Sequence, residues 1–262
     1  MKILLFGKNG QVGWELQRAL STVGKVIALD RNSTSGLCGD LANIEGLRET
    51  IRLVAPDFIV NAAAYTAVDK AESDEQMATL INATAVQVMA EEALSLGGWL
   101  VHYSTDYVFG GWGEHAWRET DAVAPTNAYG VTKLAGERAI VESGCKHLIF
   151  RTSWVYGTRG NNFPKTMLKL ARSRTELQVI SDQIGAPTGA DLIADVSAIA
   201  IRHARQNPAV SGIYHLAASG STSWYEYAKL AIDFGRAKGL DLVTQSVMPI
   251  LTSEYPTAAC RP

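Results

Sequence analysis

The chain has 262 residues, of which 47% are hydrophobic, and a formal net charge of −2. These values are typical of one large globular domain, or of one domain with a small appendage. The near-neutral charge argues against a nucleic-acid-binding or membrane-surface protein, and no apolar run reaches the ~18 residues of a membrane span. Three widely spaced cysteines without a C-x-x-C pair favour a reducing compartment, so we expect a cytoplasmic protein.

The chain opens with an apolar run that leads into a glycine-rich turn. Residues 2–6 form a short run typical of a strand buried on both faces of a parallel sheet, and too short for a signal peptide. The pattern Gly7-x-x-Gly10-x-x-Gly13 follows, and then a helix expected over 14–23. Glycines allow a tight turn and a close approach to a pyrophosphate, which the free amides of the helix N-terminus would bind.

A second strand, expected over 26–30, ends in an acidic residue. Asp30 follows Gly13 at about the spacing at which dinucleotide-binding folds place a carboxylate on the adenosine ribose. Such a carboxylate favours NAD, whereas the neighbouring Arg31 could pair with the 2′-phosphate of NADP. The sequence therefore predicts a nicotinamide dinucleotide and leaves NADH and NADPH open.

Strands and helices continue to alternate. We expect strands over 58–61, 99–105 and 147–152, and helices over 44–54, 74–96 and from Tyr129 to about Ser143. Small residues begin at Ala62, directly after one strand, and would leave room for a ligand at the carboxyl edge of the sheet. Short connections between alternating elements predict an α/β fold with a Rossmann-type doubly wound parallel sheet.

The second half of the chain is less regular. Helices are expected over 161–174, 191–205 and 223–238, and strands over 177–180, 212–216 and 242–247. We therefore expect residues 1–154 plus about 188–217 to form the dinucleotide-binding domain. Residues from about 155 to 187 plus 218–262 would form a small, irregular α/β substrate-binding part.

A tyrosine and a lysine provide the candidate catalytic group. Tyr129 and Lys133 stand four apart on a predicted helix and so share one face, where an ammonium would favour the phenolate and lower the pKa of the phenol. Thr105, at the end of a predicted strand, could offer its hydroxyl to the carbonyl oxygen that Tyr129 protonates. Beside a hydride donor, these groups would reduce a ketone. A second such pair, Tyr225 and Lys229, lies in an amphipathic helix and is interpreted as packing.

Together these features resemble the extended short-chain dehydrogenase/reductase superfamily and, within it, the dTDP-4-dehydrorhamnose reductase family. The resemblance covers essentially the whole chain, and rests on residues 6–15, 60–69, 103–109, 150–156 and 182–188. It implies the NAD(P)H-dependent reduction of the C4 ketone of dTDP-4-dehydro-L-rhamnose, for cell-surface polysaccharide synthesis. Dehydratases of the superfamily carry Thr-Asp-Glu where this chain has Thr105-Asp106-Tyr107, which favours reduction over dehydration.

The resemblance also implies roles for individual residues. The catalytic residues would be Thr105, Tyr129 and Lys133, and the residues facing the sugar nucleotide would be Thr105, Asp106, Tyr107 and Trp154. By residue type alone, Trp154 would be a core aromatic. The cofactor would contact Gly7, Gly10, Gln11, Val12, Gly13, Asp30, Arg31, Asp40, Leu41, Ala62, Ala63, Ala64, Tyr65, Thr66, Tyr103, Tyr129 and Lys133.

Some members of the family bind Mg²⁺ at a homodimer interface through three acidic residues per subunit. Glu15 matches the first of these residues and Asp191 replaces the glutamate of the second, although acids at helix starts also serve as caps. The third would lie beyond Arg261-Pro262, where family members continue into a C-terminal helix and this chain stops. We therefore expect either a truncated C-terminus or a different closure of the substrate side.

Two alternatives stay open at this point. A nicotinamide-nucleotide-binding regulatory subunit, resembling that of methionine adenosyltransferase, could keep the glycine turn and lose the catalytic trio. A reductase or epimerase of another nucleotide sugar would keep both, because base and sugar specificity lie in the irregular half of the chain.

Overall fold

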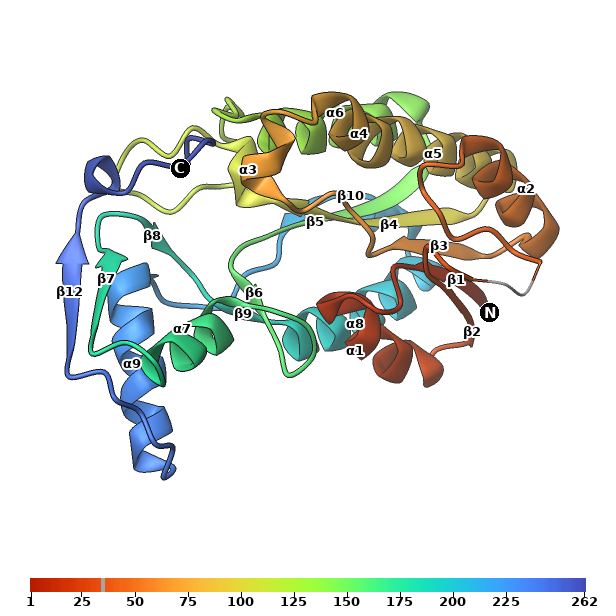
Figure 1. Cartoon of the computed structure of the whole chain (residues 1–262). Helices are drawn as coiled ribbons and strands as arrows, with labels where there is room; N and C mark the ends of the chain where they lie inside the picture. Colours follow the sequence, from red (N-terminus) through yellow and green to blue (C-terminus); the bar gives the residue numbers. More distant parts are fainter. Residues whose placement is uncertain (34–35) are drawn as a thin grey trace.

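A six-stranded parallel sheet forms the centre of the computed structural model, which describes residues 1–33 and 36–262 (Figure 1). The strand order is β10-β5-β4-β3-β1-β2, so the direction of winding reverses between β1 and β3. This arrangement confirms the predicted doubly wound fold. The strands are β1 (Lys2–Phe6), β2 (Lys25–Leu29), β3 (Phe58–Asn61), β4 (Trp99–Thr105), β5 (Lys146–Thr152) and β10 (Gly212–His215).

Helices cover both faces of this sheet (Figure 1). On one face α1 (Gln11–Ser21) packs against α8 (Ala190–Gln206), around a core that includes Leu5, Val101 and Ile193. On the other face lie α2 (Ile44–Val54), α5 (Ala85–Ser95) and α6 (Ala128–Ser143), with Leu4 and Leu100 in their core. Successive strand side chains point to opposite faces, and both faces are buried, which explains the continuous apolar runs of the sequence.

The helix predicted over 74–96 is not regular along its length. It consists of α4 (Glu75–Thr79), a π-helical turn (Leu80–Thr84) and α5, and the short α3 (Val68–Ala71) precedes it. The wide turn carries Asn82, whose side chain binds both backbone polar groups of Tyr65. Apolar residues run on through the π-helical turn into α5, so the sequence pattern predicts one continuous helix.

A smaller group of elements packs around a separate core that contains Met167, Leu177 and Ile232. Its elements are α7 (Phe163–Ala171), β7 (Glu176–Ile180), α9 (Trp224–Ala237) and β12 (Ser246–Ile250), and β7 and β12 pair in parallel. The predicted boundaries of α7 and β12 were wrong here. Thr244 bonds to the end of α7, through its amide to the Ala171 carbonyl at 3.1 Å and through its hydroxyl to the Arg174 carbonyl at 2.5 Å. The pairing with β7 therefore starts only at Ser246.

Two short pairs of strands lie between the two groups, and three 3-10 turns follow or precede other elements of the chain. The strand pairs are β6 (Val155–Tyr156) with β9 (Thr188–Gly189), and β8 (Ile184–Gly185) with β11 (Thr222–Ser223). The 3-10 turns are Asp106–Val108, Pro208–Val210 and Thr252–Glu254.

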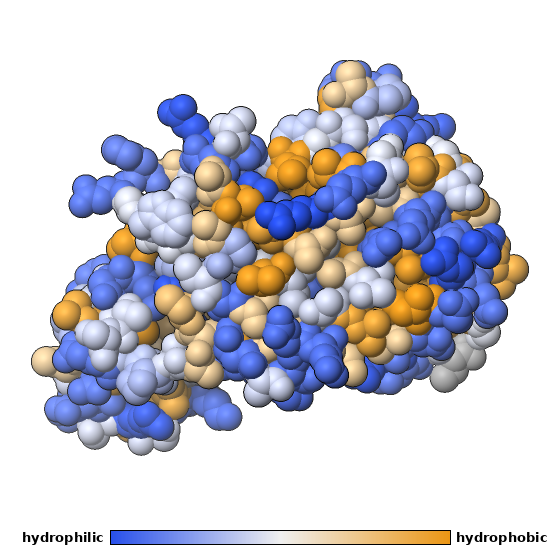
Figure 2. All heavy atoms as spheres, turned by 90° about the horizontal axis from the view of Figure 1, so that it is seen from above, coloured by the Kyte–Doolittle hydropathy of each residue, from blue (hydrophilic) through white to orange (hydrophobic). Residues whose placement is uncertain are grey.

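Seen from above, hydrophilic side chains lie between apolar ones over the surface (Figure 2). None of the described helices combines the length and the apolar character that a membrane crossing requires.

Candidate active site

The carboxyl ends of β1, β3 and β4 form one edge of the sheet, and the predicted site residues follow these ends. The glycine turn follows β1, and its outer glycines are required by backbone packing. Gly7 has a φ of 85°, and a Cβ there would lie 2.7 Å from the Ala63 amide nitrogen. A Cβ on Gly13 would collide with the Gly7 carbonyl oxygen. These two glycines hold the turn close to β3, as a dinucleotide-binding turn requires.

Gly10 differs from its two neighbours in the motif. It is the N-cap of α1, with a φ of −71°, and a Cβ there would lie no closer than 3.4 Å to the Gly7 carbonyl. The helix begins at Gln11, three residues before the predicted start, so Gln11 and Val12 occupy its first turn. Because the first amides of a helix have no intrahelical acceptor, this turn offers free donors to an anion.

These environments predict different results for two alanine substitutions. Gly10→Ala should fold normally, because the added methyl has room, and should raise the Kd for NADPH at least ~10-fold by keeping the pyrophosphate away from the amides. Gly13→Ala should reduce the stability of the protein itself. Fluorescence titration and thermal melting would separate the two effects, and an unchanged Kd for a well-folded Gly10→Ala protein would contradict the assignment.

The polar groups predicted for the adenosine side lie together after β2. The Asp30 carboxylate accepts a hydrogen bond from the Asn32 amide at 2.9 Å and lies 3.6 Å from the Lys8 ammonium, a neighbour that the sequence pattern did not indicate. Arg31 is 73% exposed, and its Nε lies 3.7 Å from the Asp40 carboxylate. The Leu41 side chain is buried in the core beside α2 and is therefore not available to a nucleotide.

The loop after β3 is held by side chains from elsewhere in the fold. Asn82 accepts a hydrogen bond from the Tyr65 amide at 2.9 Å, and donates to the Tyr65 carbonyl and the Thr132 hydroxyl, both at 3.1 Å. Ala62, Ala63 and Ala64 are partly exposed and Thr66 is exposed. Asn82 thus ties the predicted nicotinamide loop to α6. Sequence reasoning missed it, although an asparagine within an apolar helical stripe was a signal.

Tyr129 lies at the start of α6, beside the end of β4. The Asn127 side chain caps the helix by accepting a hydrogen bond from the Gly130 amide at 2.8 Å. The Thr105 hydroxyl donates to the Asp106 carboxylate at 3.0 Å, and the rings of Tyr107 and Tyr129 meet edge to face with centroids 5.6 Å apart. Four of the predicted site residues, from the end of β4, the 3-10 turn that follows it and the start of α6, therefore meet at one place.

Burial controls the protonation of this cluster. Burial raises the pKa of Tyr129 above its ordinary value, and the Asp106 and Tyr107 charges add to this effect while the Thr105 hydroxyl opposes it. Burial also raises the pKa of Asp106 to about 6 and that of Tyr107 to about 12. Tyr129 therefore remains a phenol and keeps a proton to donate.

Burial raises the pKa of Tyr129, so this pKa is not lowered as expected from the proximity of Lys133. The Lys133 Nζ donates to the Tyr103 carbonyl at 2.6 Å and lies 3.0 Å from His102 Nε2, behind the site. The Tyr103 hydroxyl donates to the Ser197 hydroxyl of α8 at 2.7 Å, on the opposite face of the sheet. Only the carbonyl of Tyr103, and not its ring, therefore lies on the Lys133 side.

The C-terminal residues of the chain also reach this region. The Arg261 guanidinium pairs with the Asp69 carboxylate at 2.5 Å and lowers the pKa of Tyr107, opposing the effect of burial. The Cys260 carbonyl accepts a hydrogen bond at 2.7 Å from Asn127, the cap of α6. Residues 260–261 thus contact both the cap of the Tyr129 helix and its neighbour Tyr107, a connection that no sequence motif indicated.

Comparison with known proteins agrees with this geometry. The family model described as the RmlD substrate binding domain matches residues 1–262. The chain belongs to this family. It is 59% identical, over 262 residues, to a dTDP-4-dehydrorhamnose reductase of Escherichia coli (strain K12), a match that covers 100% of this chain and 87% of that relative.

Two solved structures of RmlD-family relatives are similar along the whole chain. A dTDP-4-dehydrorhamnose reductase from Clostridium acetobutylicum superposes with a TM-score of 0.88 at 37% identity, covering 100% of this chain and 88% of that one. A reductase of the same name from Bacillus anthracis, solved in complex with NADP, has a TM-score of 0.87 at 35% identity, with the same coverage. The predicted fold class and family are thereby confirmed.

The last predicted substrate residue of this RmlD-family chain, Trp154, belongs to an aromatic cluster. Its ring stacks on Trp224 with centroids 3.5 Å apart, and Phe163 and Tyr227 pack against Trp224. Trp154 has a φ of 45°, a left-handed conformation that is strained for a non-glycine residue. The cluster joins the end of β5 to the smaller group of elements.

The two acidic residues predicted to bind a metal do not form a site within one RmlD-family chain. Glu15 pairs with Arg18 at 3.3 Å, and Arg18 also pairs with Asp195 at 2.8 Å. Asp191 is exposed in the first turn of α8. Within residues 1–33 and 36–262, no group of three or more His, Cys, Asp or Glu side chains could hold a metal ion.

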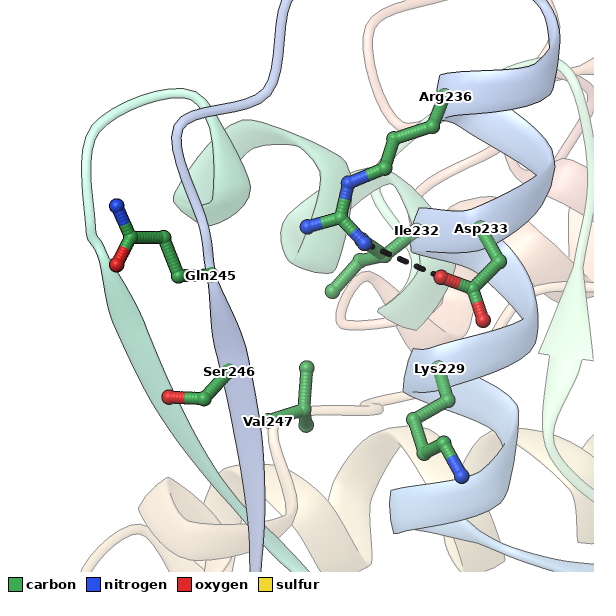
Figure 3. Close-up of a pocket in the computed structure, with 7 residues that line it drawn as sticks. All are labelled: Lys229, Ile232, Asp233, Arg236, Gln245, Ser246 and Val247. Atoms are coloured by element: carbon green, nitrogen blue, oxygen red, sulfur yellow. Dashed lines mark hydrogen bonds and ion pairs between the residues drawn. The ribbon is translucent and has the colours of Figure 1, made fainter.

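A cavity of about 140 Å³ between α9 and β12 lies apart from this site (Figure 3). Arg236, which pairs with Asp233 at 3.1 Å, and Lys229 line it. Lys229 also lies over the Tyr225 ring, 5.2 Å from its centroid. The second tyrosine–lysine pair is thus in the smaller group of elements, away from Thr105.

Proposed function

We propose that this chain catalyses the NAD(P)H-dependent reduction of the C4 ketone of dTDP-4-dehydro-L-rhamnose to dTDP-L-rhamnose, for cell-surface polysaccharide synthesis. The juxtaposition of Tyr129 and Thr105 at the sheet edge that also holds the glycine turn carries this proposal. The 59% identity with a dTDP-4-dehydrorhamnose reductase supports the substrate. We place the reaction in the cytoplasm, because the three cysteines are free.

The residues at the edge of the sheet fit a dinucleotide. Gly7, Gly10 and Gly13, with the amides of Gln11 and Val12, would bind the pyrophosphate, and Asp30 the adenosine ribose. Arg31, Asp40 and Leu41 would face the adenosine end, and residues 62–66 the nicotinamide end. A bound reduced nicotinamide would supply a hydride. A relative's complex with NADP, the Lys8 ammonium beside Asp30 and the Arg31 guanidinium beside Asp40 favour NADPH.

The side chains would handle the proton and the developing charge. Tyr129 donates its proton to the O4 oxygen, and the Thr105 hydroxyl donates a hydrogen bond to the same atom, which strengthens as that oxygen becomes an alkoxide. Lys133 would bind the nicotinamide ribose and, when charged, favour the phenolate of Tyr129. Asp106, Tyr107 and Trp154 would contact the sugar nucleotide.

We further propose the division expected above, with residues 1–154 plus about 188–217 binding the dinucleotide, and about 155–187 plus 218–262 binding the substrate. The separate core around Met167 supports this division. A homodimer is also proposed. Glu15 and Asp191 do not fit a magnesium site on their own, because Glu15 is paired with Arg18 and no third acid joins them among the described residues. We assign magnesium no step.

The direct test is the loss of reduced-nicotinamide absorbance when the purified chain meets freshly generated dTDP-4-dehydro-L-rhamnose, with NADPH and NADH assayed separately. We expect turnover with both, and the higher kcat/KM with NADPH. Binding of NAD(P)H without turnover of this ketone would overturn the proposal and favour a regulatory nucleotide-binding protein or another nucleotide sugar.

A further inference from the structure

A buried row of polar groups runs from β3 through β4 to α6, directly behind the catalytic cluster. Asn61 and His102 are partners in the sheet register, and their Nδ2 and Nδ1 atoms lie 3.2 Å apart. His102 Nε2 lies 3.0 Å from the Lys133 Nζ, which also donates to the Tyr103 carbonyl at 2.6 Å. Asn61, His102 and Lys133 are each at most 1% exposed, so hydrogen-bond partners within the protein must satisfy them.

The first member of the row fixes the direction of its hydrogen bonds. The Ala63 amide, which can only donate, points at the Asn61 side-chain oxygen at 3.1 Å. The amide nitrogen of Asn61 must therefore face His102, and this nitrogen can only donate. His102 Nδ1 has to accept, so a neutral imidazole carries its proton on Nε2, on the Lys133 side.

The Lys133 side chain faces the proton on His102 Nε2. An ammonium has three donors and no acceptor, whereas a neutral amine has one lone pair. Every group in the row is satisfied when Lys133 is a neutral amine that accepts from His102 and donates to the Tyr103 carbonyl. If Lys133 is charged, His102 must carry its proton on Nδ1, and two donors then face each other across the 3.2 Å between Asn61 and His102.

We propose that Asn61 and His102 are positioning residues that set the protonation state of Lys133, because they present His102 as its Nε2–H tautomer and so favour the neutral amine. This rests on the proposed function only for the catalytic role of Lys133. Burial acts in the same direction, lowering the pKa of Lys133 to about 8 and that of His102 well below its ordinary value.

The other groups around Lys133 do not reverse this preference. Glu137, one turn along α6, favours the ammonium, but Arg151 of β5 binds its carboxylate at 2.6 Å and Ser104 of β4 donates to it. Tyr129, one turn before, is held uncharged by its raised pKa. The π-helical turn contributes the uncharged Asn82, which binds Thr132.

This arrangement predicts a pH dependence of the reaction. The charged lysine favours the phenolate of Tyr129, so kcat/KM should fall as the pH rises through the pKa of Lys133, near 8.

In Asn61→Asp, a carboxylate oxygen replaces the amide nitrogen that faces His102, while the other oxygen still accepts from Ala63. The His102 proton then moves to Nδ1, and Nε2 can accept from the ammonium. The descending limb should move up by at least about one pH unit.

The direct test is the tautomer of His102 in the full chain labelled with ¹⁵N-histidine, read from long-range ¹H–¹⁵N correlation spectra. His102→Gln assigns the signal by its loss. We expect a proton on Nε2 in the wild-type protein near pH 8.5 and on Nδ1 in Asn61→Asp. A wild-type imidazole with its proton on Nδ1, or an imidazolium, would overturn the proposal whether or not the protein reduces the sugar.

Asn82→Asp is the matched control, because it adds the same charge beside α6 without contacting His102. It should leave the proton of His102 on Nε2. If Asn82→Asp moves the proton or the descending limb of kcat/KM as far as Asn61→Asp does, the added negative charge alone causes the effect. The proposed action of Asn61 on Lys133 through the tautomer of His102 is then wrong.

Discussion

Replacing Tyr129 with phenylalanine should lower kcat at least ~10³-fold while changing the Kd for NADPH less than about twofold. The substitution removes the hydroxyl that donates the proton and keeps the ring, so the edge contact with Tyr107 at 5.6 Å and the start of α6 are preserved. Because burial keeps this phenol protonated, its loss removes the proton donor directly.

Single-turnover kinetics and a fluorescence titration with NADPH would measure the two quantities separately. The chain offers a matched control in Tyr225→Phe, the same change in the second tyrosine–lysine pair, on α9. This control should retain turnover. Loss of NADPH binding together with turnover in Tyr129→Phe would show that the residue supports the cofactor site and not the proton transfer.

The largest effect on stability should come from the ion pair beneath the catalytic helix. Glu137 of α6 and Arg151 of β5 are 2% and 5% exposed, and two guanidinium nitrogens of Arg151 donate to the carboxylate at 2.6 and 3.0 Å. Glu137→Gln keeps the shape but leaves a buried guanidinium without its counter-charge. We expect the free energy of unfolding to fall by about 3–5 kcal/mol.

Urea unfolding followed by circular dichroism would measure this loss as a shift in midpoint at constant slope. The control is Asp233→Asn, which breaks the exposed pair with Arg236 at 3.1 Å and should cost no more than about 1 kcal/mol. Similar losses in the two variants would mean that the buried pair contributes no more than a surface pair does.

Most of the sheet could be predicted from the sequence, because its strands are buried on both faces and appear as continuous apolar runs. Phe58–Asn61 and Trp99–Thr105 coincide with their predicted ranges. The strand β12 could not be located in the same way. It lies outside the main sheet, and the inward turn of Thr244 toward Arg174 depends on a contact between segments about 70 residues apart in the chain.

The site could be predicted only as far as the backbone determines it. The spacing placed Tyr129 and Lys133 on one helical face. The long lysine side chain, however, extends to His102 of β4, and a contact with the sheet beneath the helix cannot be predicted from spacing along the helix. Tyr103 could have been assigned better, because alternation along β4 directs it away from the face that His102 occupies. The role of Asn82 depends on the π-helical turn, which the apolar pattern does not reveal.

The pairing of β7 with β12 has a consequence for the order in which the chain folds during synthesis. β10 completes the central sheet at His215, whereas β7 has to wait for residues 246–250 before it gains its partner. Leu177 and Val179 of β7 therefore leave the ribosome well before the strand and helix that cover them. The large sheet can close first, and the aromatic cluster around Trp154 then forms on a finished surface.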